Sequence, residues 1–140
     1  MRHELAVLFL FLIGCALYDV KEKRISLLYT GAFAAMGIYM SVNAGREPLS
    51  VLCAAAPGAA LMAVSLITGG AIGFGDGIAV AAAGTFIDAE SVLVMCCLGF
   101  LFAAAGAGAA FIIRRRGQDE LPFMPFLLAG CAAGAFLYGL

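Results

Sequence analysis

The sequence predicts an all-α membrane protein, with six transmembrane helices in a single bundle and both termini outside. Two features of the composition predict this fold class. Hydrophobic residues make up 64% of the chain and charged residues 12%, whereas soluble domains are about half apolar and about a quarter charged. The mean hydropathy, +1.07, is strongly positive. The length of 140 residues allows one domain, residues 1–140, and leaves no room for a separate soluble module.

Six apolar stretches supply the expected helices, because a segment that crosses lipid must satisfy its own backbone hydrogen bonds. They run over about Leu5–Val20, Ser26–Val42, Leu49–Thr68, Gly77–Ile87, Ser91–Ile113 and Leu121–Leu140. Arg2 precedes the first stretch as in a signal peptide, but no small-residue cleavage site follows, so we expect a retained helix. Pro57 lies inside the third stretch and predicts a kink there.

The positively charged residues predict the orientation. Six spans alternate sides, so the connections after the first, third and fifth stretches share one face. That face carries Lys21, Lys23, Arg24, Arg114, Arg115 and Arg116. The opposite face carries only Arg2 and Arg46. The excess of positive charge makes the first face cytoplasmic, and Asp19 and Asp76 both fall on that side.

The cysteines and the single histidine argue against a metal site or a disulfide framework. No CxxC pair occurs, and His3 lies next to the N-terminus. We therefore expect no metal and no cofactor, and we interpret the cysteines as free, buried, small hydrophobic residues. They are Cys15, Cys53, Cys96, Cys97 and Cys131.

Asp76 is a carboxylate within a glycine-rich segment, Gly69–Gly77, that separates two apolar stretches. An ionisable residue at such a place in a membrane protein is costly, so a functional role is the default hypothesis. Gly73 and Gly75 leave the neighbouring backbone bare, which lets other groups approach the carboxylate closely. The structural alternative is that Asp76 is a helix N-cap.

Asp19 is the expected partner, because the two aspartates fall at a similar depth. The apolar residues before Asp19 extend about 21 Å as a helix and those after Asp76 about 17 Å, against a hydrocarbon core of about 30 Å. Two close carboxylates share one proton. The charged one can take a proton from water while the other donates to a substrate carbonyl, which hydrolyses a peptide without a metal or covalent intermediate. The alternative is that Asp19 merely begins a polar loop.

Helix dipoles predict how the pair divides these roles. Asp76 precedes a helix, whose N-terminus stabilises negative charge, whereas Asp19 lies near the C-terminus of its helix. We therefore expect Asp76 to be the carboxylate and Asp19 to carry the proton. The other acidic residues have structural explanations: Asp88 and Glu90 belong to a solvated turn, and Asp119 and Glu120 cap the last helix.

Three motifs resemble those of one protease family. Gly73-Phe74-Gly75-Asp76 resembles the GxGD motif of intramembrane aspartyl proteases. Tyr18–Ser26 is similar to the first motif of the prepilin peptidases, an aspartate followed six residues later by isoleucine and then usually by Pro-Asn. Leu121–Leu127 is similar to the Pro-Phe-x-Pro-Phe opening of their last helix. By these motifs, in the family's order, the chain is identified as a short member of the type IV prepilin peptidase family.

The resemblance implies an aspartic endopeptidase of the bacterial inner membrane that cuts prepilin or pseudopilin leaders on the cytoplasmic side. Asp19 and Asp76 are then the catalytic residues, the partners are membrane lipid and substrates with a basic, then apolar leader, and nucleic acid is no partner. Larger members carry a four-cysteine domain and methylate the new N-terminus, so we expect peptidase activity only. Two departures bear on substrate choice: Ser26-Leu27 replaces Pro-Asn, and Ile78 stands where many members have lysine.

Two other functions fit a small membrane protein with paired acids. A proton-coupled transporter would use Asp19 and Asp76 as a proton relay. It would more naturally place its acids near mid-membrane between repeated halves, and no internal repeat is visible in the sequence. A structural assembly subunit could keep the fold without the activity.

Overall fold

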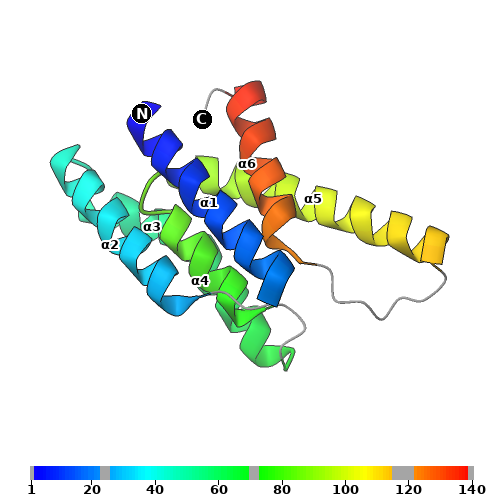
Figure 1. The fold of residues 1–140 in the computed structure, drawn as a ribbon. Coiled ribbons are helices and arrows are strands. Elements are labelled where there is room, and N and C mark those ends of the chain that lie inside the picture. Colours follow the sequence, from blue (N-terminus) through cyan, green and yellow to red (C-terminus); the bar gives the residue numbers. More distant parts are fainter. Residues whose placement is uncertain (1, 23–25, 70–72, 115–121, 139–140) are drawn as a thin grey trace.

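The computed structural model describes residues 2–22, 26–69, 73–114 and 122–138, and these residues form helices and no strand. The helices are α1 (Arg2–Glu22), α2 (Leu27–Asn43), α3 (Pro48–Ile67), α4 (Phe74–Ala83), α5 (Ala89–Arg114) and α6 (Met124–Tyr138). Each corresponds to one predicted apolar stretch, so the all-α prediction is confirmed. α1 begins and α6 ends at the same side of the molecule, whereas α1 ends and α4 and α6 begin at the other (Figure 1).

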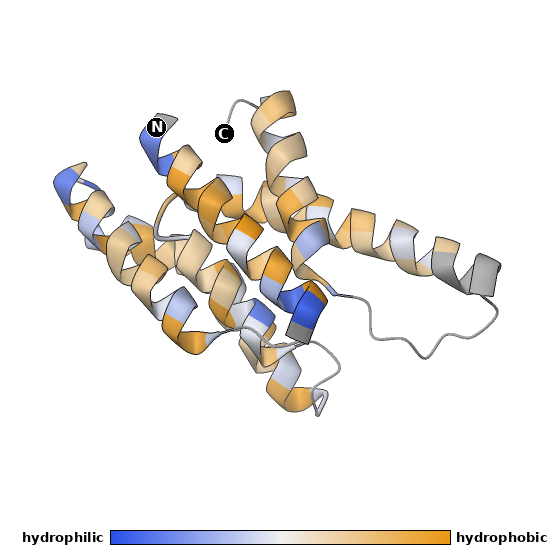
Figure 2. Ribbon diagram, in the orientation of Figure 1, coloured by the Kyte–Doolittle hydropathy of each residue, from blue (hydrophilic) through white to orange (hydrophobic). Residues whose placement is uncertain are grey.

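Three helices are long and apolar enough to cross a membrane by their length and composition. These are His3–Lys21, Pro48–Ile67 and Ala89–Ala109. The apolar helices α4 and α6 are shorter, with 10 and 15 residues. Hydrophilic residues gather at helix ends and the helices between these ends are mostly apolar (Figure 2). Many large apolar side chains are exposed, among them Leu10, Tyr39 and Phe136. Such a surface suits lipid, and the chain is a membrane protein.

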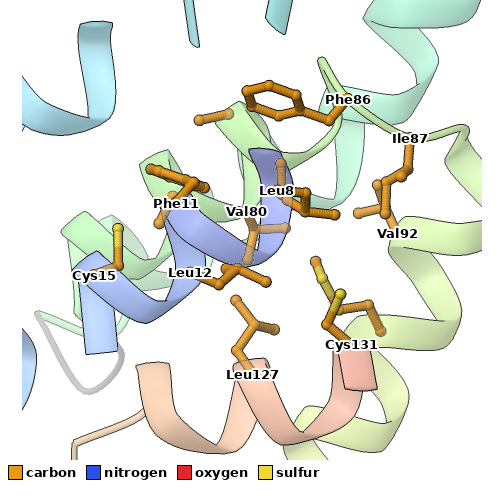
Figure 3. Close-up of a cluster of buried hydrophobic side chains, with 14 of the residues drawn as sticks. Leu8, Phe11, Leu12, Cys15, Val80, Phe86, Ile87, Val92, Leu127 and Cys131 are labelled. Carbon is orange, nitrogen blue, oxygen red and sulfur yellow. The ribbon is translucent and has the colours of Figure 1, made fainter. Parts of the chain in front are cut away.

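The core forms where α1 meets α4, α5 and α6. Leu8, Leu12 and Cys15 follow one another at helical spacing on α1, so they share a face, and all three are buried. That face meets Val80 of α4 and Leu127 of α6 (Figure 3). The next residue on the same face of α1, one turn further on, is Asp19. The core therefore leads directly to the candidate site.

Glycines bring α3 and α4 into contact through their backbones. A Cβ atom added to Gly58 would lie 2.5 Å from the carbonyl oxygen of Gly77, and one added to Gly77 would lie 2.6 Å from Cγ of Met62. Gly84 meets the backbone of Ala54 in the same way. Small residues permit this close approach of membrane helices. α3 thus fixes the position of α4 and of Asp76 in its first turn.

Arg46 ties together the two connections at the other end of α4. Its guanidinium donates to the carbonyl oxygens of Ile87, at 2.9 Å, and Thr85, at 3.2 Å. It also donates to the Ser41 hydroxyl, which itself donates to the Thr85 carbonyl. These carbonyl groups follow the end of α4, where the helix can no longer satisfy them.

Two predictions about these elements need correction. The fourth helix does not run from Gly77 to Ile87: it begins at Phe74, because the Asp76 amide already donates to the Gly73 carbonyl at 3.0 Å, and it ends at Ala83, where a turn follows. The cysteines are free, but only three are buried; Cys53 and Cys97 are exposed. Their helix faces need no protein partner, because lipid accepts an apolar side chain.

Candidate active site

Asp19 lies within α1, one turn before the helix ends at Glu22. Its side chain is 8% exposed, on the face that also carries Cys15 and Leu12. The alternative in which Asp19 merely begins a polar loop is therefore wrong. Burying a carboxylate without a hydrogen-bond partner costs several kcal/mol, so its surroundings must supply a partner.

The partner is the start of α6. Oδ2 of Asp19 accepts a hydrogen bond from the backbone amide of Met124, the first residue of that helix, at 3.1 Å. The bond joins residues far apart in the sequence. Our sequence interpretation missed it, because Pro122–Pro125 indicated only that a helix opens there. The nearest signal was the pair of prolines, which mark a helix start whose free amides need acceptors.

Asp76 lies in the first turn of α4 and is half-buried. Gly73 is the N-cap of this helix, so Asp76 is not the N-cap that the structural alternative supposed. The Asp76 side chain folds back over Gly73, where an added Cβ would lie 2.8 Å from Oδ2 and 3.3 Å from Cγ. Residue 73 must therefore lack a side chain for the carboxyl group to keep this position.

The two aspartates lie within electrostatic range of each other. Both also lie within range of the buried Cys15 of α1. Helices α1 and α4 thus converge on this point, and α6 reaches it through Met124. Two carboxyl groups so close in an apolar setting cannot both ionise cheaply, so they favour holding one proton between them. Such a pair is suited to general acid–base chemistry.

The remaining residues singled out from the sequence lie around this pair or apart from it. Gly75 is the second residue of α4 and is half-buried, as is Ile78. Ser26 is the N-cap of α2 and accepts from the Tyr29 amide at 3.4 Å, and Leu27 is exposed. Where Ser26 replaces the proline of the motif, it therefore starts a helix.

The other acidic residues contribute nothing to the pair. Asp88 is exposed and accepts a hydrogen bond from the Ser91 hydroxyl at 2.6 Å, and Glu90 is exposed in the first turn of α5. Asp88 therefore fits the predicted turn, whereas Glu90 already belongs to the helix, because α5 begins at Ala89. Asp119 and Glu120 lie outside the described residues. Within the part of the chain that is described, no group of three or more His, Cys, Asp and Glu side chains could hold a metal ion.

Comparison with known proteins adds one result. The model of the type IV leader peptidase family matches residues 6–139, essentially the whole chain. Neither the curated proteins nor the solved structures contain a match.

Proposed function

We propose, because this chain belongs to the type IV leader peptidase family, that it is an aspartic endopeptidase for prepilin or pseudopilin leaders. Its substrates would carry a basic, then apolar leader. The proposed catalytic residues are Asp19 and Asp76, with Gly73 and Gly75 keeping the backbone beside them bare. The observation that carries the proposal is the approach of two aspartates, one of them buried, from separate helices.

The proposed reaction needs only this pair and water. The ionised aspartate takes a proton from a water molecule, whose oxygen attacks the carbonyl carbon of the scissile bond. The protonated aspartate donates its proton to the carbonyl oxygen as the C=O double bond opens. When the tetrahedral intermediate collapses, the C–N bond breaks and the nitrogen receives the proton that the first aspartate took from water. The second aspartate regains its proton from the hydroxyl group of the intermediate as the C=O bond forms again. The leader leaves with a carboxyl terminus and the mature protein with a free amino terminus.

We place the site on the cytoplasmic side of a bacterial inner membrane. Six membrane crossings with both termini outside would put the positively charged connections in the cytoplasm. The end of α1, the start of α4 and the start of α6 lie on one side of the molecule, which supports a single site at one membrane face (Figure 1). The apolar part of a leader would lie along the helices in lipid while its scissile bond reaches the pair.

Cleavage of a co-expressed prepilin tests the proposal. Replacing either aspartate by alanine removes one half of the acid–base pair, so Asp19→Ala and Asp76→Ala should each leave the leader uncut. Asp88→Ala is the matched control, because Asp88 is an exposed turn residue, and it should cut like the wild type. All variants should reach the membrane at equal levels by immunoblot.

The alternatives predict different outcomes. If each aspartate variant still cuts the leader, the protease assignment is wrong. If the folded wild type cuts no prepilin, while Asp19→Ala abolishes proton-coupled uptake, the transporter is favoured. We further propose that the enzyme acts as a peptidase only, so the new amino terminus should keep its unmodified mass.

A further inference from the structure

The hydrogen bond between Asp19 and Met124 has no part in the reaction just described. We infer that the backbone amide of Met124, at the start of α6, is a positioning group for the Asp19 carboxylate. This inference rests on the proposed function, because it specifies how the same site is held ready for reaction. It stands on a 3.1 Å hydrogen bond to a carboxylate that is 8% exposed.

The Met124 amide is available because of the sequence around it. The first amides of a helix have no acceptor within that helix. Pro125 has no amide hydrogen, and the Phe126 amide donates to the Phe123 carbonyl at 3.0 Å. Among the first three residues of α6, the Met124 amide is therefore the one that needs an acceptor outside the helix. Oδ2 of Asp19 supplies it.

The start of α6 is itself firmly placed. The Met124 side chain is fully buried in the core, as is Leu127 in the next turn. Further along, α6 lies directly against α5, because a Cβ added to Gly130 would lie 2.6 Å from the amide nitrogen of Gly99. The donor therefore sits on a rigid part of the molecule, which is what a positioning group requires.

The bond divides the two oxygens of Asp19 between different tasks. Oδ2 is held by the Met124 amide, so Oδ1 is the oxygen that would meet water in the reaction. Fixing one oxygen also fixes the rotation of the carboxylate about its last bond. The reacting oxygen is then already held in one position before the reaction, which lowers the activation barrier.

The bond also bears on which aspartate carries the charge. An amide at a helix start suits an acceptor with negative charge. Among the described residues, Asp76 on α4 and Cys15 on α1 are titratable groups in range of Asp19. We therefore assign the ionised role to Asp19, which takes the proton from water, and the donor role to Asp76. This reverses the division that the sequence led us to expect, because Asp19 faces the start of α6 as well as the end of its own helix.

The amide resonance of Met124 tests the contact without any assay of activity. Protein labelled with ¹⁵N-methionine in nanodiscs gives few signals, and Met124→Leu identifies the one from residue 124. Asp19→Ala removes the acceptor, so this amide proton should move upfield and exchange faster with solvent. Asp88→Ala is the control and should leave it in place. An unmoved signal in a folded Asp19→Ala protein would refute the contact.

Two substitutions at residue 124 test its effect on catalysis. Met124→Pro removes the amide hydrogen at a helix position that tolerates proline, and Met124→Ala removes the same buried side chain but keeps the amide. We expect Met124→Pro to have a kcat at least about tenfold below that of Met124→Ala, with equal KM, since this amide donates to Asp19 and is not free to bind a substrate. Equal kcat values would refute the positioning role. A wild-type protein that cuts no leader would refute the proposed function, while the resonance still decides the contact.

Discussion

The Asp76 carboxyl group and the bare backbone of Gly73 occupy adjacent space at the start of α4. An added Cβ at residue 73 would lie 2.8 Å from Oδ2 of Asp76, closer than such atoms approach each other. Because Oδ2 is the end of a flexible side chain, the carboxyl group would move and the helix would not. The absence of a side chain at residue 73 thus determines where the Asp76 carboxyl group points. The stability of the protein depends far less on residue 73.

Substitution of Gly73 by serine should therefore separate activity from stability. Serine is a favourable N-cap, so α4 should still start at Phe74. Its Cβ displaces the Asp76 carboxyl group, and we expect kcat to fall by about tenfold to a hundredfold.

Gly31→Ser is the matched control, because an added Cβ at Gly31 on α2 meets nothing within 4 Å. It should keep wild-type kcat. Leader cleavage by purified protein and thermal unfolding in detergent measure the two properties. Wild-type kcat in Gly73→Ser would show that the Asp76 position is unimportant.

At this scale the sequence predicted a pair of side chains but not their backbone partners. Charge sidedness and the lengths of the apolar stretches brought Asp19 and Asp76 together as a pair. The Met124 amide was missed because every residue except proline carries such a donor, so the residue type gives no sign of it. Only the meeting of α1 with the start of α6 makes it specific.

Helix α4 depends on α3 for its place. It has 10 residues, too few to span the hydrocarbon core unaided. Its Gly77 and its C-cap Gly84 contact the backbone of α3, where Gly58 lies against α4. These contacts involve backbone atoms, which cannot rotate away as a side chain can. A change there must separate the helices, and so move Asp76 as well.

Replacing Gly58 by alanine should lower stability. Its Cβ would lie 2.5 Å from the Gly77 carbonyl oxygen, so the two helices must shift. Overpacking of this kind costs about 1–3 kcal/mol in the free energy of unfolding.

Gly108→Ala is the control, because an added Cβ at Gly108 on α5 meets nothing within 4 Å. It should be neutral or slightly stabilising, since alanine favours a helix. Unfolding in a denaturing detergent titration measures both variants. Equal stability of Gly58→Ala and Gly108→Ala would contradict the close α3–α4 contact.

The elements show where sequence interpretation succeeds and fails. Six apolar stretches predicted six helices, because lipid leaves few other ways to satisfy a backbone. The limits of α4 were misplaced, because Gly69–Gly77 was interpreted as a segment between two apolar stretches, whereas its last residues form the first turn of the helix. Which helix faces meet depends on the whole bundle, so the role of Gly58 could not be predicted from its neighbours in the sequence.

On the scale of the whole molecule, the two ends of the bundle have different tasks. One end carries the aspartates and the start of α6. At the other end of α4, Arg46 joins the connection between α2 and α3 to the connection between α4 and α5. From the sequence, Arg46 was interpreted only as a positive charge on the outer face. Its role could not be predicted, because its partners are backbone carbonyl groups of a segment distant in the sequence.

Reporter fusions test the orientation of the molecule. With six crossings and both termini outside, alkaline phosphatase fused after Leu140 should be active, and green fluorescent protein at the same place should stay dark. Fusions after Arg116, in a positively charged connection, should show the opposite pattern. A fluorescent fusion after Leu140 would show that this terminus lies in the cytoplasm. Our assignment of the two faces would then be wrong.

The central claim is that Asp19 and Asp76 form one catalytic unit, and a double-mutant cycle tests it most directly. The cleavage rate of a prepilin leader should be measured for purified wild type, Asp19→Asn, Asp76→Asn and the double variant. We predict that the cleavage rate of each single variant falls by about 10²–10⁴-fold. The double variant should be no slower than the slower single variant, because neither carboxyl group can catalyse the reaction without the other. Losses that multiply in the double variant, or a single variant that cuts at the wild-type rate, would contradict the account.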